Sequence, residues 1–401
     1  MTLEEVIYGR RSVRKFKSTP VSDSIIRDLI DAAIQAIEAS EKPLIFYGGG
    51  VTLSNTAEEL RAIVRRLGCP VTSTIMGLGC IDPNDKNFLG FAGMHGSYGA
   101  NMAIQESDLI IAIGMRFSDR VTGRVADFAP NAKIIHFELD PAEVNKNVRV
   151  DYRVLGDLAW SLPILRTKLD TLNTDFESRY NTWLQSVLDK AAAHPFSYDA
   201  SGSVIKPGAL ITKISELSDE NTIAVTDVGQ HQMWAAQFFK AKKPRQFLTS
   251  GGLGTMGFGL PAAMGAKLGC PNKNVVLFTG DGSIMMNIQE LSTIADHNIN
   301  VKVVIVHNSI LGMVGQWQRL FYNHHYSHSE LKGKRDFVKI AEAMGIKGYR
   351  IDKAEELETR LPEILASDEP AVIDVMIPED ENVLPMVPVG KRLDQMVLGT
   401  N

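Results

Sequence analysis

The sequence predicts an α/β fold with two Rossmann-like parallel sheets in separate domains. Short apolar runs rich in β-branched residues recur along the chain, and segments with helical periodicity separate them. Glycine-rich or polar loops follow several of these runs, as expected at the carboxyl edge of a parallel sheet. A polar and charged stretch at residues 171–204 interrupts the pattern. We therefore expect one α/β domain on either side of a linker.

Composition excludes several classes of protein. The 401 residues are 44% hydrophobic and 22% charged, which is ordinary for a globular chain of two or three domains. A net charge of −5 offers no basic surface for nucleic acid. No apolar run is long enough to span a membrane, and the N-terminus lacks a signal-peptide core, so we expect a cytoplasmic protein. Cys69, Cys80 and Cys270 lack metal-binding spacing and are expected to be free thiols.

The first α/β unit covers residues 37–170. We expect strands at residues 43–47, 70–74, 108–114 and 133–139, and a helix at residues 56–67. The loops that follow the strands should gather at one edge of the sheet. On the residues alone, their glycines suit tight turns as well as ligand contact. The loop residues selected as candidates are Gly48, Gly49, Thr74, Met76, Met94, His95, Gly114, Arg116, Arg120 and Asp140.

The second unit covers residues 205–384, and a tail follows at 385–401. Helical periodicity is expected at 207–217, 285–298 and 337–344, and strands at 222–226, 274–279, 301–306 and 371–376. His324 and His328 have the i, i+4 spacing of some zinc sites, but the segment lacks a helical pattern, so we interpret it as a loop near the site.

Two polar residues in this unit follow neighbouring apolar strands. Asp281 comes after the strand at 274–279, and Asn308 comes after the strand at 301–306. Parallel strands would place both at one edge, where a carboxylate and an amide oxygen suit Mg²⁺ together with phosphate oxygens. Ser283 would be the N-cap of the next helix, whose N-terminus favours phosphate. The alternative is a strand, turn and helix that bind nothing.

Residues 280–322 resemble the cofactor-binding half of thiamine-diphosphate enzymes, in particular the acetolactate synthase (acetohydroxyacid synthase) large catalytic subunit. The resemblance extends from about residue 37 to the C-terminus. It implies a transferase that condenses pyruvate with pyruvate or 2-ketobutyrate, with loss of CO₂, in the biosynthesis of valine, leucine and isoleucine. The implied cofactors are thiamine diphosphate, Mg²⁺ and FAD.

The resemblance also implies roles for individual residues. Met256 would bend the cofactor, although a methionine in the core is the common alternative. Ile310 would give its backbone carbonyl as a third metal ligand beside Asp281 and Asn308, and Trp317 would shape the second-substrate pocket. The implied thiamine-diphosphate contacts are Gln230, His231, Gly254, Met256, Gly280, Asp281, Gly282, Ser283, Asn308, Met313 and Val314.

Residues 114–123 match the stretch of the same family that contacts FAD. Arg116 and Arg120 would be its cations, while Ser118 stands where the family usually has an acidic residue. The implied FAD site consists of the loop residues selected above in the first unit. The family's FAD is largely structural, because the reaction has no net redox change.

Residues 1–36 resemble the beginning of a nitroreductase-type flavoprotein. That family would use the matching Arg10, Arg11, Ser12 and Arg14 on the FMN phosphate. The rest of a nitroreductase does not follow, so we expect an amphipathic helix at 22–35 that is docked or tethered, with the junction near Gln35.

No stretch of the chain matches the family's pyrimidine-binding domain. That domain carries the catalytic glutamate, and the family's site forms between two chains. We therefore assign no catalytic glutamate and expect weak diphosphate binding and poor turnover from this chain alone. A homodimer or homotetramer, with a small regulatory subunit, is the expected assembly. The alternatives are a non-catalytic cofactor-binding chain or another thiamine-dependent 2-ketoacid decarboxylase, and residues 312–318 argue against the latter.

Overall fold

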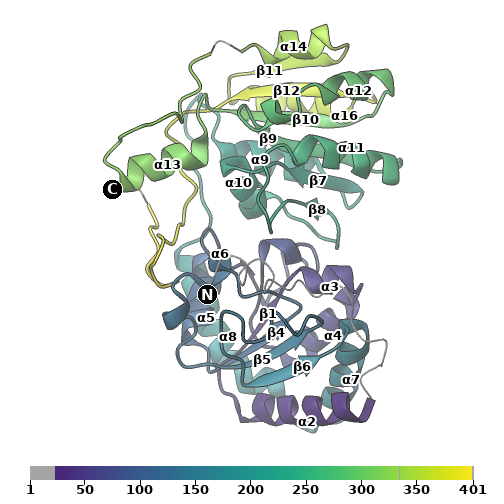
Figure 1. The fold of residues 1–401 in the computed structure, drawn as a ribbon, viewed down its shortest axis with the longest axis vertical. Helices are drawn as coiled ribbons and strands as arrows, with labels where there is room; N and C mark the ends of the chain where they lie inside the picture. Colours follow the sequence, from purple (N-terminus) through teal and green to yellow (C-terminus); the bar gives the residue numbers. More distant parts are fainter. Residues whose placement is uncertain (1–22, 334, 400–401) are drawn as a thin grey trace, which may run out of the picture.

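A computed structural model describes the backbone of residues 23–333 and 335–399, and the side chains from residue 29. Two α/β domains lie one above the other, each built on a six-stranded sheet (Figure 1). All strand pairs in the two sheets are parallel, which confirms the predicted fold class. Within the described residues, none of the helices is long and apolar enough to span a bilayer.

The first sheet has the order β3-β2-β1-β4-β5-β6. Its strands are β1 (Pro43–Tyr47), β2 (Val71–Ser73), β3 (Phe88–Phe91), β4 (Leu109–Ile113), β5 (Lys133–Glu138) and β6 (Tyr152–Leu155). The helices and turns of this domain are α2 (Asp23–Ala39), α3 (Gly49–Leu53), α4 (Ala57–Leu67), η1 (Ile75–Gly77), α5 (Tyr98–Glu106), α6 (Asp119–Thr122), η2 (Val125–Asp127), α7 (Leu158–Asp170) and α8 (Phe176–Ala193).

The central strands of this sheet are buried on both faces. Side chains alternate across a strand, so Ile45 and Tyr47 of β1 join one core with helices α2, α4 and α7. Leu44 and Phe46 join the other core, which α5 and α8 cover. Burial on both faces explains why these strands read as continuous apolar runs in the sequence.

The second sheet has the order β11-β12-β10-β9-β7-β8. Its strands are β7 (Thr222–Thr226), β8 (Phe247–Leu248), β9 (Asn274–Gly280), β10 (Lys302–His307), β11 (Lys347–Ile351) and β12 (Ala371–Met376). Its helices and turns are α9 (Pro207–Leu217), α10 (Gln230–Phe238), α11 (Gly259–Gly269), η3 (Ile284–Met286), α12 (Glu290–Asp296), α13 (Gly312–Phe321), α14 (Phe337–Ala343), α15 (Glu356–Thr359) and α16 (Leu361–Ala366). Helices α9 and α10 cover one face, and α11, α12 and α14 cover the other.

Helix α8 belongs to the first domain, although the sequence suggested a linker at residues 171–204. Tyr180 is buried, and its hydroxyl donates to the backbone oxygen of Ile37 at 2.7 Å. The indole nitrogen of Trp183 donates to the backbone oxygen of Pro43 at 3.0 Å. The apolar spacing in this segment therefore marks a face that packs on the first sheet, so the linker prediction was too broad.

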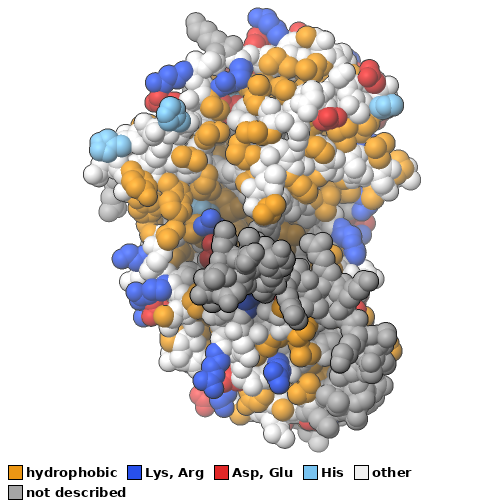
Figure 2. Space-filling model, viewed as in Figure 1, with side chains coloured by type: hydrophobic (Ala, Val, Ile, Leu, Met, Phe, Trp, Pro, Cys, Tyr) orange, Lys and Arg blue, Asp and Glu red, His pale blue; other side chains and the backbone are white. Residues whose placement is uncertain are grey.

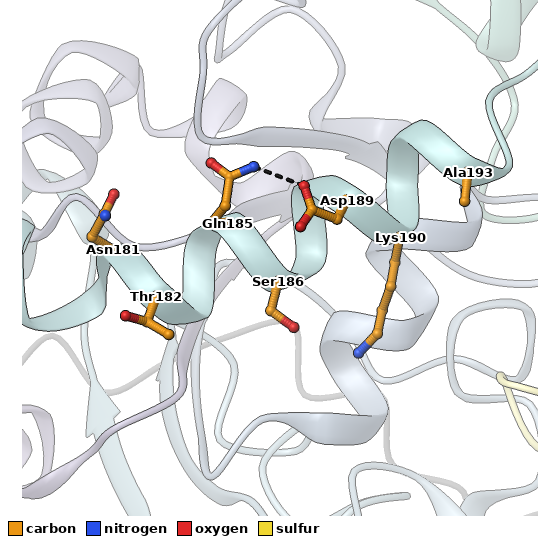
Figure 3. A pocket seen from close by; sticks show the side chains of 7 residues that line it. All are labelled: Asn181, Thr182, Gln185, Ser186, Asp189, Lys190 and Ala193. Atoms are coloured by element: carbon orange, nitrogen blue, oxygen red, sulfur yellow. Dashed lines mark hydrogen bonds between the residues drawn. The ribbon is translucent and has the colours of Figure 1, made fainter.

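The opposite face of α8 is polar. Figure 3 shows its side chains lining a shallow depression, with Gln185 Nε2 donating to Asp189 Oδ1 at 2.8 Å along the helix. Lys190, on the same helix, pairs with Glu106. These charges are satisfied locally on an open surface, so this depression offers no convergent chemistry.

Helix α2 runs without a break across the predicted junction near residue 36. Ile30, Ala33 and Ile37 are fully buried in the core of the first domain. The helix is thus docked, and residues 37–39 complete its last turn and do not begin a new unit. Arg10, Arg11, Ser12 and Arg14 lie outside the described residues.

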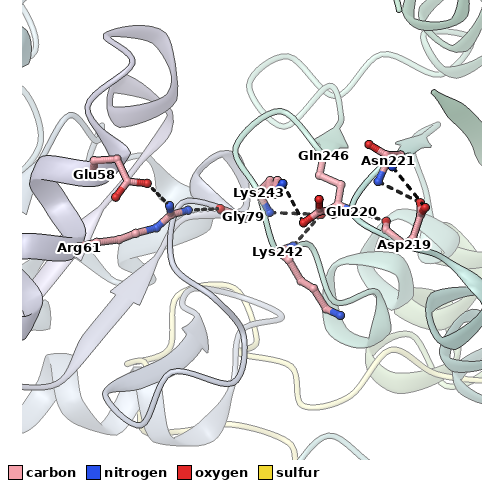
Figure 4. A network of polar contacts seen from close by, with 9 residues as sticks. All are labelled: Glu58, Arg61, Gly79, Asp219, Glu220, Asn221, Lys242, Lys243 and Gln246. Carbon is pink, nitrogen blue, oxygen red and sulfur yellow. Dashed lines mark hydrogen bonds and ion pairs between the residues drawn. The ribbon is translucent and has the colours of Figure 1, made fainter. Parts of the chain in front are cut away.

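Close backbone contacts join the two domains. A Cβ atom on Gly79, whose φ is +90°, would lie 2.2 Å from the backbone oxygen of Lys243, so this approach requires glycine. Arg245 Nη2 donates to the backbone oxygen of Thr52 at 2.8 Å. Figure 4 shows the polar network beside this contact, in which the amide of Gln246 accepts from the backbone of residues 242 and 243.

The residues after β12 return to the first domain. The backbone nitrogen of Val387 donates to the oxygen of Met94 at 2.8 Å, and that of Arg124 donates to the oxygen of Lys391 at 3.0 Å. Val387 and Leu393 are buried in the core that α5 and α8 cover. We call residues 377–399 the C-terminal segment, and it links the second sheet to the first domain.

Candidate functional site

One pocket lies at the carboxyl edge of the second sheet, where β7, β9 and β10 end. The register pairs Val306 with Gly280, so Asp281 and Asn308 follow neighbouring strands at the same edge. Both residues line the pocket. Its walls consist of Val228, Gly229, Gln230, His231, Trp234, Met256, Gly280, Asp281, Gly282, Ser283, Val306, Asn308, Ile310, Leu311, Gly312, Met313 and Val314.

Asp281 is a buried carboxylate with an unused oxygen. Its side chain is 1% exposed, and its Oδ2 has no hydrogen-bond partner within the described part of the chain. Burial raises the pKa of this carboxyl group, and His307, whose Nε2 lies 3.7 Å from Oδ2, opposes that rise. A buried carboxylate oxygen without a donor is costly unless a ligand completes its environment.

Asn308 presents its amide to the pocket through a fixed set of contacts. Its Nδ2 donates to Gln230 Oε1 at 3.1 Å, which leaves Oδ1 on the other side of the amide. Oδ1 accepts only a long bond of 3.3 Å from the backbone nitrogen of Ile310. The two amide hydrogens of Gln230 are both used within the protein, on Gln316 and on the backbone oxygen of Glu381. Gln230 thus has a use that differs from the predicted contact with phosphate.

The last residues of β10 separate this pocket from a second cavity. Val306, Asn308 and Ile310 face the pocket, whereas His307 and Ser309 line the neighbouring cavity with Arg335 and Arg350. Ser309 has a φ of +59°, which is unusual for a residue with a side chain. At this turn, residues 308 and 310 line the pocket while residue 309 lines the neighbouring cavity.

Two glycines allow these side chains to approach the strand ends. A Cβ on Gly280 would lie 2.9 Å from Nδ1 of His231. A Cβ on Gly312 would lie 2.0 Å from Oε1 of Gln230 and 2.8 Å from Nδ2 of Asn308. Any larger residue at either position would displace a side chain that lines the pocket.

Among the described residues that line this pocket, His231 is the other one with an unpartnered buried side-chain atom. It is 6% exposed, and its Nε2 lacks a partner among the described residues. Burial lowers its pKa to about 3, so the imidazole is neutral at neutral pH. A neutral imidazole can donate one hydrogen bond, and an anion in the pocket would be a suitable acceptor.

The helix predicted after Asp281 is interrupted, so this part of the sequence prediction was wrong. A short 3₁₀ turn, η3, and only then α12 replace the expected helix. Ser283 does not cap it, because its hydroxyl donates to the backbone oxygen of Val228 at 2.9 Å. Instead, the N-termini of α10 and α13 face the pocket, at Gln230 and at Gly312. The positive N-terminal ends of two other helices, α10 and α13, thus take the place of the helix end that was predicted to favour an anion.

The remaining predicted contacts of this domain divide into two groups. Met256, Met313 and Val314 line the pocket and give it an apolar wall. Gly254 and Trp317 do not line it. Trp317 lies on α13, one helical turn beyond Met313, with its ring edge-on to Phe321 at 5.7 Å between centroids.

The predicted flavin residues lie along the carboxyl edge of the first sheet. Gly48 N donates to the oxygen of Ile113 at 3.0 Å, where a Cβ on Gly48 would lie 2.7 Å from Cβ of Met115. Gly49 begins helix α3, so it is not in a loop. Thr74 and Gly114 follow β2 and β4, and Asp140 follows β5. The residues selected from the sequence therefore lie at one edge of the first sheet, as expected, and Gly48 allows close packing there.

These residues do not all share one pocket. Met94 and Arg120 line a cavity with Val387 and its neighbours from the C-terminal segment. Arg116 is exposed, and its Nη2 lies 3.3 Å from the position of a Cβ on Gly252. His95 is 6% exposed, and burial lowers its pKa to about 4.

The first edge touches the second domain beside the pocket. Met76 is 44% exposed, and its Sδ lies 2.6 Å from where a Cβ on Gly251 would be. The loop at 250–254, which precedes Met256 in the chain, therefore contacts the first edge. Figure 2 shows hydrophobic side chains gathered beside the hollow between the domains. Leu253 and Val314, at 90% and 48% exposure, are among the exposed apolar residues of this half.

The site has the composition of a cation site that needs a phosphate partner. Within the described residues, no three His, Cys, Asp or Glu side chains are placed to hold a metal together. Instead, Asp281 with its carboxylate, Asn308 with its amide, and Ile310 line the same pocket. Mg²⁺ commonly takes few protein oxygens and completes its shell with phosphate and water oxygens. The residues present therefore fit Mg²⁺ bound together with a diphosphate.

Comparison with known proteins gives a consistent picture. Residues 30–165 match the family description "Thiamine pyrophosphate enzyme, central domain", and residues 227–375 match "Thiamine pyrophosphate enzyme, C-terminal TPP binding domain". Relatives include the probable acetolactate synthase large subunit of Methanococcus aeolicus, 44% identical over 92% of this chain and 63% of the relative. Others are the acetolactate synthase large subunit of Lactococcus lactis (43%, over 94% of this chain and 64% of the relative) and isozyme 2 of Escherichia coli (41%, over 92% and 66%). The chain spans a little under two thirds of these relatives' lengths.

Proposed function

Because the chain belongs to the thiamine pyrophosphate enzyme family, we propose that it is the diphosphate-binding part of an acetolactate synthase large subunit. The proposed reaction joins two 2-ketoacids, pyruvate with pyruvate or 2-ketobutyrate, with loss of CO₂, for branched-chain amino acid biosynthesis. The observation that carries this proposal is the convergence of Asp281 and Asn308 in one pocket of the TPP binding domain. The names of the relatives support the reaction class.

The proposed metal is Mg²⁺, with Asp281, Asn308 and the backbone oxygen of Ile310 as its protein ligands. The unpartnered Oδ2 of Asp281 supports this role, because a cation would compensate a buried negative charge. His231 would donate its unused imidazole hydrogen to a diphosphate oxygen. The N-termini of α10 and α13 would add their positive ends toward the same anion.

The apolar wall would hold the ring part of the cofactor. When bound, thiamine diphosphate supplies the carbon nucleophile that adds to a 2-ketoacid. Met256 would hold the cofactor in a bent conformation, with Met313 and Val314 against the thiazolium ring. Trp317, on the next turn of α13, would form one wall of the second-substrate pocket. These residues orient the cofactor and exclude water, so they act through geometry.

We assign FAD to the carboxyl edge of the first sheet. Arg116 and Arg120 would contact its phosphates, because both are exposed cations beside that edge. Met94 and the C-terminal segment would enclose part of the ligand, since they already share a cavity with Arg120. Contact between Met76 and the loop at 250–254 would place this cofactor close to Met256.

The exposed apolar rim supports a partner domain over the pocket. Leu253, Met286 and Val314 are 90%, 53% and 48% exposed, and each belongs to the second domain. We assign this rim to contact with a pyrimidine-binding domain that carries the catalytic glutamate of the family. The proposed assembly is a dimer or tetramer of large subunits with a regulatory subunit.

Binding and turnover can be tested separately. Calorimetric titration with thiamine diphosphate in the presence and absence of Mg²⁺ should show binding that depends on the metal. Acetolactate formation from pyruvate, with thiamine diphosphate, Mg²⁺ and FAD, should be poor for this chain alone and rise when a pyrimidine-binding domain is supplied. Failure to bind thiamine diphosphate with Mg²⁺ would contradict the diphosphate site. Full turnover without the supplement would contradict the need for an external glutamate.

A further inference from the structure

Gln316 connects the pocket to the C-terminal segment. It lies on α13 and is fully buried. Its Oε1 accepts from the backbone nitrogen of Val383 at 2.8 Å, and its Nε2 donates to the backbone oxygen of the same residue at 3.1 Å. The peptide groups of Val383 cannot exchange their polarity. They therefore determine which end of the Gln316 amide is oxygen and which is nitrogen.

The same polarity passes to Gln230. Its Nε2 donates to Gln316 Oε1 at 2.9 Å and to the backbone oxygen of Glu381 at 2.8 Å. Both acceptors lie on the same side of the amide, so both hydrogens of Nε2 are engaged. Gln230 must then present Oε1 on its opposite side, toward Asn308.

The last step in this series concerns Asn308. Since Gln230 offers an acceptor, Asn308 turns its Nδ2 toward it, at 3.1 Å. Its Oδ1 is consequently directed to the pocket that Asp281 also lines. If the amide were reversed, the pocket would receive two N–H donors, which cannot bind a cation. The backbone of residues 381–383 thus decides which atom of Asn308 a cation meets.

We propose that Gln316 is a positioning residue for the cation site, acting through Gln230 to turn Oδ1 of Asn308 toward the metal. This inference rests on the proposed function, because it assigns a task toward Mg²⁺. It also makes the C-terminal segment part of the metal site, although that segment supplies no ligand. Partners beyond the ligands commonly change metal affinity by about 10- to 100-fold when they are replaced.

The first test is metal affinity. Mg²⁺ would be titrated calorimetrically into the full chain at a saturating concentration of thiamine diphosphate. Gln316→Met keeps the side-chain volume but loses the polarity, and we expect about 10-fold weaker Mg²⁺ binding. Gln316→Glu, in its neutral form, can still accept from Gln230 and donate to Val383, so it should remain within about twofold of the unmodified chain. Gln232→Met is the matched control, because Gln232 is also buried but donates to Thr249.

The second test replaces the proposed amide ligand by a side chain whose two terminal atoms are both oxygens. Asn308→Asp replaces the amide by a carboxylate whose two oxygens are equivalent. In this background Gln316→Met should no longer weaken Mg²⁺ binding, whereas a general structural defect would weaken it equally in both backgrounds. Equal loss in both backgrounds, or no loss with Asn308 present, would overturn the proposal. Absence of Mg²⁺ binding by the unmodified chain would instead refute the proposed function.

A third measurement needs no cofactor. Amide hydrogen exchange at Val383 should be faster in Gln316→Met than in the unmodified chain, because its N–H loses the Oε1 acceptor. Gln232→Met should leave this exchange rate unchanged. Unchanged exchange in Gln316→Met would show that Gln316 does not hold the C-terminal segment, and the proposal would fail. This readout also identifies whether a variant is folded before its metal affinity is interpreted.

Discussion

The two domains share one architecture but differ at their carboxyl edges. The first edge has closely packed glycines and exposed arginines. Gly48, for example, donates its backbone N–H to Ile113 and packs against Met115. At the second edge, the buried atoms of Asp281 and His231 that have no partner among the described residues belong to side chains that line one pocket. At the first edge, His95 also has an unpartnered buried atom, but it does not line the cavity that Met94 and Arg120 share. The same sheet architecture thus carries a pocket lined by buried polar groups at one edge and closely packed glycine loops at the other. What distinguishes them is whether unsatisfied buried groups share one pocket, which the fold itself does not determine.

The largest expected effect tests whether α8 is part of the first domain. Trp183→Ala removes a buried ring and its bond to the backbone oxygen of Pro43, so the free energy of unfolding should fall by about 3–5 kcal/mol. Trp160→Ala, at a site 63% exposed on α7, should change it by less than about 0.5 kcal/mol. Urea unfolding followed by circular dichroism measures both. Equal effects would place α8 outside the core of the first domain.

The next effect concerns the second edge alone. Asp281→Ala removes the proposed carboxylate ligand, and Mg²⁺-dependent binding of thiamine diphosphate should weaken by about 100-fold, the upper range for changes around a metal. Flavin binding, measured by fluorescence quenching, should not change. Asp296→Ala, an exposed position on α12, provides the control. A comparable loss of flavin binding would show that the two edges are not independent.

Acid sensitivity should differ between the edges. Burial lowers the pKa of His95 to about 4 and that of His231 to about 3, both below the unfolded value of about 6.5. The unfolded state therefore binds more protons between these values, and stability falls as pH decreases below 6.5. Between pH 6.5 and 5, each histidine should cost about 2 kcal/mol.

Thermal unfolding of two variants between pH 7 and 4 would separate these contributions. His95→Asn should remove a loss of stability that levels off near pH 4. His231→Asn should remove a loss of stability that is still increasing at pH 4. If neither variant reduces the acid sensitivity, these buried imidazoles do not control it.

The smallest expected effect concerns the first edge. Arg116→Ala should weaken FAD binding by about 10-fold, as expected for one charge-assisted bond to phosphate. Thiamine-diphosphate affinity should remain unchanged. Arg65→Ala, exposed on α4, controls for the loss of positive charge. Unaltered FAD affinity in Arg116→Ala would remove this residue from the flavin site.

Sequence reasoning found all eight interior strands and missed the four that form the sheet edges. Interior strands are buried on both faces and appear as apolar runs, as in β4 and β10. The edge strands β3, β6, β8 and β11 have two to five residues and mixed burial, so they leave no continuous apolar pattern. The hydrophobic pattern thus identified the centre of each sheet but not its width.

The site was predicted unevenly for a related reason. Asp281 and Asn308 could be predicted from strand ends, because parallel strands bring their carboxyl ends together. Gln316 could not, since its backbone partner Val383 lies 67 positions downstream, and a glutamine on an amphipathic helix has no distinctive signal. Polarity in a buried network depends on tertiary contacts, which a local pattern does not contain.

Residues 306–310, at and just after the end of β10, alternate between two neighbouring cavities. Asn308 and Ile310 project into one chamber, while His307 and Ser309 project into the adjoining one beside Arg350. We expect a change on one side of this segment to affect the other side, because consecutive residues share their peptide planes. Substitutions at His307 or Ser309 should thus be regarded as indirect changes to the proposed cation site, even though neither residue lines its pocket.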